Sequence, residues 1–119
     1  MSELMDILES LCPEIEKELK PKLGSILLGP FIRGYLPQSW VFRTEKETVT
    51  FSVDKKGITA VKEGAVEEPD VTIEIDHEFL VEALKSRSQP EKAPEKNDIE
   101  FHTTKGETAF NFLKKRFGL

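Results

Sequence analysis

The N-terminal part of the chain carries a helical pattern of hydrophobic residues. An apolar side chain recurs at every third or fourth position, which places these residues on one stripe of a helix: Leu4, Leu8, Leu11, Ile15 and Leu19. Pro13 interrupts the stripe, and proline is accepted at a first helical position. The pattern therefore predicts one helix that ends near Cys12 and a second that begins at Pro13, or else one kinked helix. Pro21 is predicted to end the helical part.

The next segment, Leu23 to Pro37, fits no single regular element. It combines large apolar residues with three glycines and two prolines. Two interpretations stay open: a connector buried against a sheet, or a surface that faces lipid or a partner protein. In the second case, the residues available for a protein partner or for self-association are Ile26, Leu27, Leu28 and Phe31. Arg33 alone does not make a basic membrane anchor, so we expect at most transient membrane contact.

After Pro37 the pattern changes to a period of two, which indicates a sheet. Five short segments alternate, with these residues on one face of each: Trp40 and Phe42; Val49, Phe51 and Val53; Ile58 and Ala60; Val71, Ile73 and Ile75; Ile99 and Phe101. The intervening residues are mostly polar, as in an antiparallel sheet with one wet face. Short turn sequences at 44–47 and 54–57 predict that the first four strands form a meander.

Two further helices are predicted in the second half of the chain. The first follows Asp76, and its apolar stripe contains Phe79, Leu80, Ala83 and Leu84. A polar loop over residues 86–97 separates it from the last strand. The second helix begins at a capping residue, Thr104, and its apolar stripe contains Ala109, Phe110, Leu113 and Phe117.

Together these elements predict a single α+β domain over residues 1–119. Residues 1–37 form an N-terminal helical and apolar connector region, and residues 38–119 form the core of sheet and helices. The predicted order is α-β-β-β-β-α-β-α, with a five-stranded, largely antiparallel sheet that has one face covered by helices. A chain of 119 residues has the commonest size of one domain.

Composition narrows the classes of partner and compartment. The net charge of −5 argues against nucleic acid, because a protein that tracks phosphates needs a clustered basic surface. Cys12 is the single cysteine, so no disulfide forms within the chain. The first residues lack the basic start of a signal peptide, and no segment is long and apolar enough to span a bilayer. We therefore expect a cytoplasmic protein.

The sequence contains no recognisable catalytic or cofactor motif. His77 and His102 are its only histidines, and neither lies in a nucleophile motif, so both are interpreted as surface residues. Phosphate-binding glycine motifs and calcium-loop spacings are absent from the sequence. The consecutive residues Asp76, His77 and Glu78 point in different directions and do not converge on a metal. We expect no enzyme activity, no cofactor and no metal.

One stretch of the chain resembles a known family. Pro69-Asp70-Val71-Thr72-Ile73 precedes a helix with Phe79-Leu80, and a later strand leads into a helix with Ala109. Over residues 39–117 this order resembles the sterol carrier protein 2 family. The resemblance implies an apolar tunnel between sheet and helices that accepts fatty acyl chains, sterols or other lipids.

The resemblance also implies which residues line the tunnel. The helical wall would consist of Phe79, Leu80, Leu84, Phe110, Leu113 and Phe117. The sheet wall would consist of Phe51, Val53, Ile73 and Phe101. The family has an apolar-containing segment before the last strand, where this chain has the polar loop 86–97, so the tunnel is either open there or closed into an ordinary core.

Two functions follow as hypotheses. The first is a non-enzymatic carrier or binding domain for an apolar ligand such as a fatty acyl, sterol-like or isoprenoid lipid. The alternative is a protein-interaction or oligomerisation module with a filled core, which docks through the apolar segment 24–36.

Overall fold

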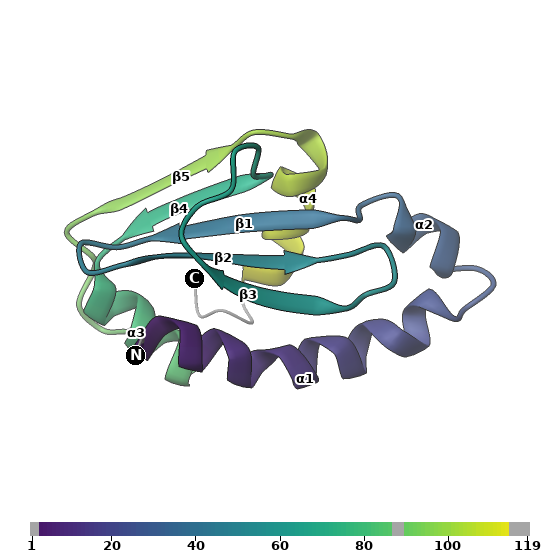
Figure 1. Cartoon of the computed structure of the whole chain (residues 1–119), viewed down its shortest axis with the longest axis horizontal. Coiled ribbons are helices and arrows are strands. Elements are labelled where there is room, and N and C mark those ends of the chain that lie inside the picture. The colour runs from purple at the N-terminus through teal and green to yellow at the C-terminus, as the bar shows by residue number, and fades with distance from the viewer. Residues whose placement is uncertain (1–2, 87–89, 115–119) are drawn as a thin grey trace.

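The structure is a computed structural model that describes residues 3–86 and 90–114. Within these ranges the chain forms four helices and five strands (Figure 1). They are α1 (Glu3–Leu23), α2 (Gly29–Arg33), β1 (Gln38–Arg43), β2 (Thr48–Val53), β3 (Thr59–Glu63), β4 (Val71–Ile75), α3 (His77–Ser86), β5 (Asn97–Phe101) and α4 (Thr104–Leu113). The predicted α+β class is confirmed, and α2 adds one helix to the predicted order.

All five strands form one mixed sheet, in the order β3-β2-β1-β4-β5. The pairs β1–β2, β2–β3 and β4–β5 are antiparallel, whereas β1 and β4 are parallel. The predicted meander of four strands is wrong, because the chain leaves β3 at one edge and returns beside the central strand β1. The sheet is mixed rather than largely antiparallel, since this crossover makes β1 and β4 run in the same direction.

The crossover, residues 64–70, passes over the face of the sheet that the helices leave free (Figure 1). Its start is held by the Thr50 hydroxyl, which donates to the Gly64 carbonyl at 2.7 Å. Val41 and Thr50 are paired neighbours on this face, and they are only 1% and 2% exposed. The face that was predicted to be wet is therefore partly covered by the chain itself.

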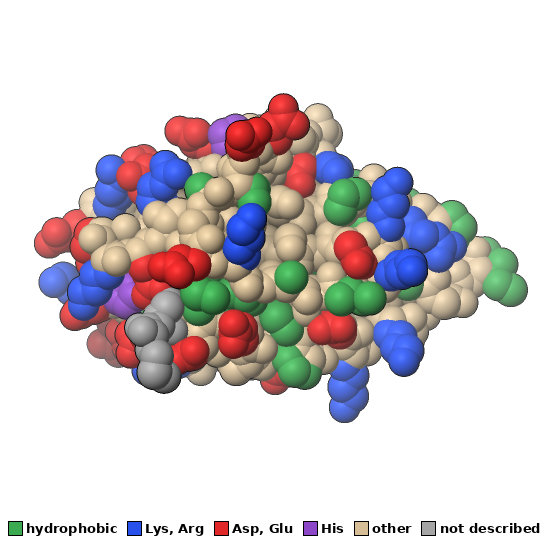
Figure 2. Space-filling view, viewed as in Figure 1, with side chains coloured by type: hydrophobic (Ala, Val, Ile, Leu, Met, Phe, Trp, Pro, Cys, Tyr) green, Lys and Arg blue, Asp and Glu red, His purple; other side chains and the backbone are tan. Residues whose placement is uncertain are grey.

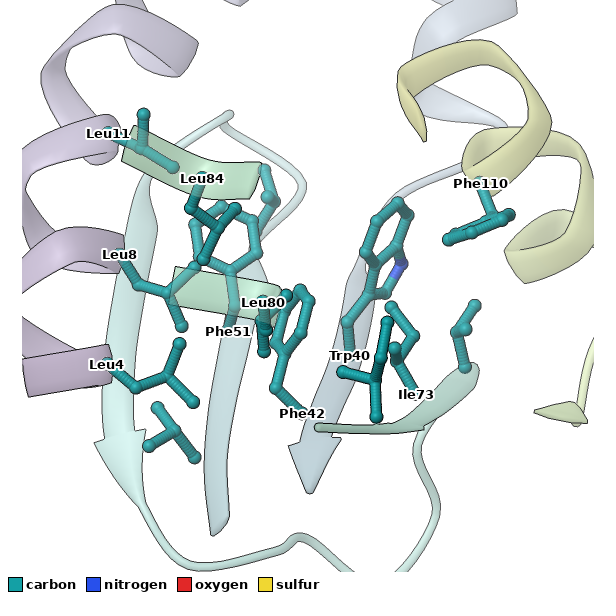
Figure 3. Close-up of a cluster of buried hydrophobic side chains, with 14 of the residues drawn as sticks. Leu4, Leu8, Leu11, Trp40, Phe42, Phe51, Ile73, Leu80, Leu84 and Phe110 are labelled. Atoms are coloured by element: carbon teal, nitrogen blue, oxygen red, sulfur yellow. The ribbon is translucent and has the colours of Figure 1, made fainter. Parts of the chain in front are cut away.

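A hydrophobic core fills the space between the other face of the sheet and the helices (Figure 3). Its largest buried side chains include Leu4 and Leu8 of α1, Leu80 and Leu84 of α3, and Trp40, Phe42 and Ile73 of the sheet, with Phe110 of α4 beside them. Three helices from separate parts of the chain thus pack on one face, as the alternating strand pattern predicted.

The helix α1 is continuous over 21 residues and contains both Pro13 and Pro21. The prediction of two helices that meet at Pro13 is wrong, and so is the predicted end at Pro21, because the helix continues to Leu23. Both prolines lie on the exposed side. The buried residues on the other side hold the helix against the sheet and α3, and this packing outweighs the backbone hydrogen bonds that the prolines remove.

The edge strand β3 presents a different face from the one predicted. Val61 pairs with Phe51 of β2 and therefore shares its inward face. Ile58 lies before the strand and is 54% exposed, and Ala60 is exposed as well. The predicted inward face of Ile58 and Ala60 is wrong, because an edge strand with several exposed apolar residues gives an ambiguous pattern.

The start of α4 is fixed by a cap and by a close backbone contact. The capping residue is Thr103, one position before the predicted Thr104, and its hydroxyl accepts a hydrogen bond from the Gly106 N–H at 3.0 Å. Gly106 packs so tightly on the crossover that an added Cβ would lie 2.6 Å from the Asp70 carbonyl oxygen. The Asp70 carboxylate accepts from the Thr103 hydroxyl at 2.7 Å and from the Ser39 N–H at 2.9 Å. These bonds join α4, β1 and the crossover.

Candidate functional site

A cavity of about 460 Å³ lies beside the filled core. Its walls come from the second half of α1, the α2 region, the strands β1 and β2, and α4. The residues that line it are Leu11, Glu14, Ile15, Glu18, Leu19, Lys22, Leu28, Phe31, Ile32, Tyr35, Leu36, Gln38, Trp40, Phe51, Val53, Thr108, Ala109 and Phe112. Its volume falls within the range of about 300–1,000 Å³ that is typical of ligand pockets.

The cavity arises because the short helix α3 covers only part of the sheet. Leu80 and Leu84 of α3 are 0% and 1% exposed, and they fill the space against the first half of α1. The apolar stripe of α1 continues beyond α3 with Ile15 and Leu19, which are only half-buried and face the cavity. One amphipathic helix thus packs a core with its first half and roofs a cavity with its second half.

The floor of the cavity is apolar and well shielded from solvent. It is made by Trp40, Phe51 and Val53, which are 2%, 5% and 7% exposed. The ring of Phe110 on α4 lies beside Trp40, with ring centroids 5.6 Å apart, and packs against the indole (Figure 3). The floor is therefore a buried apolar surface with two aromatic side chains.

The polar groups at the floor already have partners within the protein. The Trp40 indole N–H donates to the Gln38 side-chain oxygen at 2.9 Å. The Gln38 amide nitrogen donates to the carbonyl oxygens of Tyr35 at 2.7 Å and of Lys105 at 3.0 Å. Since these groups are satisfied, an apolar molecule on the floor would leave no buried donor unpaired.

Charged side chains line the cavity along one helix. Glu14, Glu18 and Lys22 of α1 follow one another at four-residue spacing and add a polar margin to the apolar wall. The opposite wall, on α4, contributes Thr108, Ala109 and Phe112. The walls are thus mainly apolar, with a charged margin along α1.

The residues that the family resemblance implied are only partly in this cavity. Phe51 and Val53 line it. Four others lie in the filled core: Ile73, Leu80, Leu84 and Phe110. The helical wall is formed by α1, α2 and α4 rather than by α3 and α4, because α3 packs directly on the sheet.

The remaining four predicted residues lie elsewhere. Phe79 is half-buried against the core, and Phe101, on the edge strand β5, is 39% exposed with its ring 5.5 Å from that of Phe110. Leu113 ends α4, and its side chain falls outside the described residues. Phe117 lies wholly outside them.

The segment 23–37 combines both interpretations that its sequence left open. Leu36 is buried and Ile32 is half-buried, and both line the cavity. Ile26 and Leu27 are 92% and 87% exposed, so this part is not a connector buried against the sheet. The hydrophobic stripe of α1 and the glycine-rich apolar segment were the available signals, but neither one indicates a cavity by itself.

A polar cluster joins the starts of α1 and α3, at the other end of α1 from the cavity. His77 is 3% exposed, so the interpretation of a surface histidine is wrong for this residue. Its Nδ1 lies 3.1 Å from the Thr44 hydroxyl, and its Nε2 lies 3.4 Å from the Glu3 carboxylate of α1. The burial arises because the first turn of α1 packs against α3, which the local sequence does not reveal.

The same cluster changes the acidity of one carboxyl group. The backbone N–H of His77 donates to the Glu45 carboxylate at 2.8 Å, and this bond is the main cause that lowers the pKa of Glu45 below its ordinary value. His102, by contrast, is exposed, and its Nε2 lies 2.9 Å from the Thr72 hydroxyl. The His77 contacts thus connect α3 with Thr44 and α1, and the His102 contact connects the end of β5 with β4.

The described residues show neither a metal-binding cluster nor a membrane-spanning helix. Across residues 3–86 and 90–114, no group of three or more His, Cys, Asp or Glu side chains is arranged to hold a metal ion. None of the helices in the same ranges has the length and apolar character needed to cross a membrane.

Neither a comparison with protein-family models nor a comparison with curated proteins finds a match to this sequence.

Proposed function

We propose that the chain is a non-enzymatic binding or carrier domain for an apolar ligand, which occupies the cavity between α1, α2, α4 and the sheet. The observation that carries this proposal is an apolar cavity of about 460 Å³ in a chain of only 119 residues. In a domain of this size, space that is not filled by side chains reduces the stabilising core. A ligand that fills the cavity supplies the missing contacts.

The expected affinity follows from the apolar surface that a ligand would bury. About ten methylenes at about 0.8 kcal/mol each contribute about 8 kcal/mol, from which association and ordering subtract several kcal/mol. The remaining free energy of about 4–6 kcal/mol corresponds to a dissociation constant between about 40 μM and about 1 mM. Such affinity suits a carrier, which must release its ligand as well as bind it.

The ligand class is a lipid with a fatty acyl, sterol-like or isoprenoid body. The aromatic floor and the apolar stripe of α1 support this choice, as do the polar groups at Gln38 and Trp40 that are already hydrogen-bonded within the protein. The resemblance to the sterol carrier protein 2 family points to the same ligand class. Recognition in such a cavity depends on size and shape rather than on hydrogen bonds.

Trp40 provides a direct test, because it is the only tryptophan and lies on the cavity floor. A fatty acid that carries bromine on its chain should quench Trp40 fluorescence saturably, while the same fatty acid without bromine should compete. Quenching that stays linear up to millimolar concentration, as from collisions in solution, would overturn the proposal.

A pair of variants on α1 locates the binding site. Ile15→Asn places a polar amide in the cavity wall and should weaken binding at least tenfold. Lys17→Asn on the exposed side of the same helix is the matched control and should change affinity less than twofold. Equal affinities for the two variants, with both folded by circular dichroism, would place the ligand elsewhere.

A further inference from the structure

The connection between α1 and α2 forms an exposed apolar tip, which we define as Ile26, Leu27, Leu28 and Phe31. Their exposed fractions are 92%, 87%, 49% and 64%. Single apolar residues are common on surfaces, but four large ones within six positions form a contiguous patch, which is typical of an interaction site. The tip lies at one end of the elongated molecule, whose extents are 43 × 27 × 26 Å (Figure 1).

The apolar tip is also the edge of the cavity. Leu28 and Phe31 are both exposed and line the cavity. Phe112 of α4 also lines the cavity and is 81% exposed. The cavity therefore opens between exposed apolar side chains of two separate elements.

The charge around the apolar tip has the opposite sign to that of the whole chain. Residues 19–37 contain no aspartate or glutamate but carry Lys20, Lys22 and Arg33, although the chain as a whole has a net charge of −5. Lys20 and Lys22 lie in the last turn of α1, directly before the tip. The Arg33 guanidinium donates to the Leu23 carbonyl at 3.2 Å, which holds it beside the tip.

Further cations come from the turn between β2 and β3. Gly57 of that turn lies against the end of α1, since an added Cβ would meet the Leu23 side chain at 2.6 Å. Lys55 and Lys56 precede it and are exposed, so the turn is basic even with the exposed Asp54 counted. In Figure 2, lysine and arginine side chains gather near the end of the molecule at which hydrophobic side chains form the outermost surface.

We propose that the apolar tip docks on a lipid surface with anionic headgroups. Exposed apolar side chains surrounded by cations match such a surface, because the side chains enter the boundary layer while Lys and Arg pair with the headgroups. Against a polar protein surface, the projecting side chains of the tip would stay in contact with water. In a lipid layer they would be buried among apolar chains. The docking is reversible, since only a few residues enter.

This role rests on the proposed function, because docking brings the mouth of the cavity against the membrane. A lipid could then pass between Leu28, Phe31 and Phe112 without crossing water. The basic side chains would orient the molecule with its acidic remainder away from the anionic surface.

The test is co-sedimentation of the full chain with phosphatidylcholine vesicles, with and without phosphatidylserine. We expect clear binding to the anionic vesicles and at least tenfold weaker binding to the neutral ones. Each cation near an anionic surface strengthens partitioning about fivefold, so Lys20→Ala with Lys22→Ala should weaken binding about 25-fold. Equal binding of the wild-type chain to both vesicle types would overturn the proposal.

Two double variants separate the tip from the overall charge. Ile26→Glu with Leu27→Glu should abolish vesicle binding without affecting the fold, because both side chains are almost fully exposed. Lys46→Ala with Lys85→Ala changes the net charge by the same two units at the other end of α1, where these lysines lie near Glu78 and Glu3. This control should bind within twofold of the wild type, and a loss equal to that of the tip variant would overturn the docking geometry.

Two further measurements distinguish the failure of docking from other outcomes. Trp40 quenching by the brominated fatty acid in solution should be unchanged in the tip variant. If quenching works in the wild type but vesicle binding fails, docking is wrong and the proposed function stands, whereas failure of quenching refutes the proposed function. A wild-type dimer in analytical ultracentrifugation that the tip variant abolishes, without vesicle binding, would assign the tip to a second copy of the chain.

Discussion

Replacement of Ala109 by leucine tests whether the cavity is open space. Ala109 is half-buried and lines the cavity from α4. Leucine adds three carbon atoms, and at about 0.8 kcal/mol per buried methylene their full burial would contribute about 2.4 kcal/mol. Because the cavity is wider than one side chain, burial is incomplete, and we expect a gain of about 1–2 kcal/mol in the free energy of unfolding. This gain corresponds to an increase in Tm of about 4–8 °C.

The same substitution at Ala83 is the matched control. Ala83 lies on α3, is 0% exposed and does not line the cavity. Leucine there must displace packed neighbours, so Ala83→Leu should destabilise the protein by about 1–3 kcal/mol. The two variants therefore have opposite predicted signs for an identical chemical change.

Two assays measure the effect of Ala109→Leu. Urea unfolding gives the change in stability, and quenching of Trp40 by a brominated fatty acid gives the affinity. The variant should be more stable than the wild type but should bind at least tenfold more weakly, because its leucine occupies the volume of the ligand. If Ala109→Leu is destabilised as much as Ala83→Leu, the region is a filled core and the reasoning from the cavity is refuted.

Two further predictions concern the fold around the site. Gly106→Ala should lower the free energy of unfolding by about 1–3 kcal/mol in urea titrations, because its Cβ would lie 2.6 Å from the Asp70 carbonyl oxygen. Gly24→Ala is the control and should be close to neutral, because its Cβ would make only ordinary contacts at 3.6 Å. The lowered pKa of Glu45, caused by the His77 N–H, means that this carboxylate stabilises the fold above pH 4.5 and that the contribution is lost as the pH falls through the folded-state pKa. Between pH 5 and about pH 3, the free energy of unfolding should therefore decrease less for Glu45→Gln than for the wild type. An equal decrease in the two proteins would contradict this link.

Several elements could be predicted from the sequence because they depend on local geometry. The spacing from Leu4 to Leu19 predicted a helix, and the alternation in β1, β2, β4 and β5 predicted which side chains face the helices. Backbone geometry alone fixes the periods of 3.6 and 2 residues, so a single segment is enough to show them. Where exposed apolar residues blurred the period, as at Ile58, the prediction failed.

The candidate site was predictable only in part, for a physical reason. A pattern shows that Leu80 and Ile15 both belong to an apolar stripe, but it does not show how closely another element approaches each of them. Leu80 meets the sheet and is fully buried, whereas Ile15 faces a cavity because α3 does not extend over it. Cavity and core are made of the same residue types, and only distances between segments distinguish them.

The sequence by itself determined the inward faces of α1, β1, β2, β4 and β5, the absence of acidic residues from 19–37 and the apolar character of segment 23–37. The tertiary structure decided that β4 returns beside β1, that His77 is buried and that Ile26 and Leu27 stay exposed. Each of these depends on contacts between residues far apart in the chain. Local propensity specifies the direction of a side chain, but only the packing of distant segments decides whether it meets protein, solvent or an open cavity.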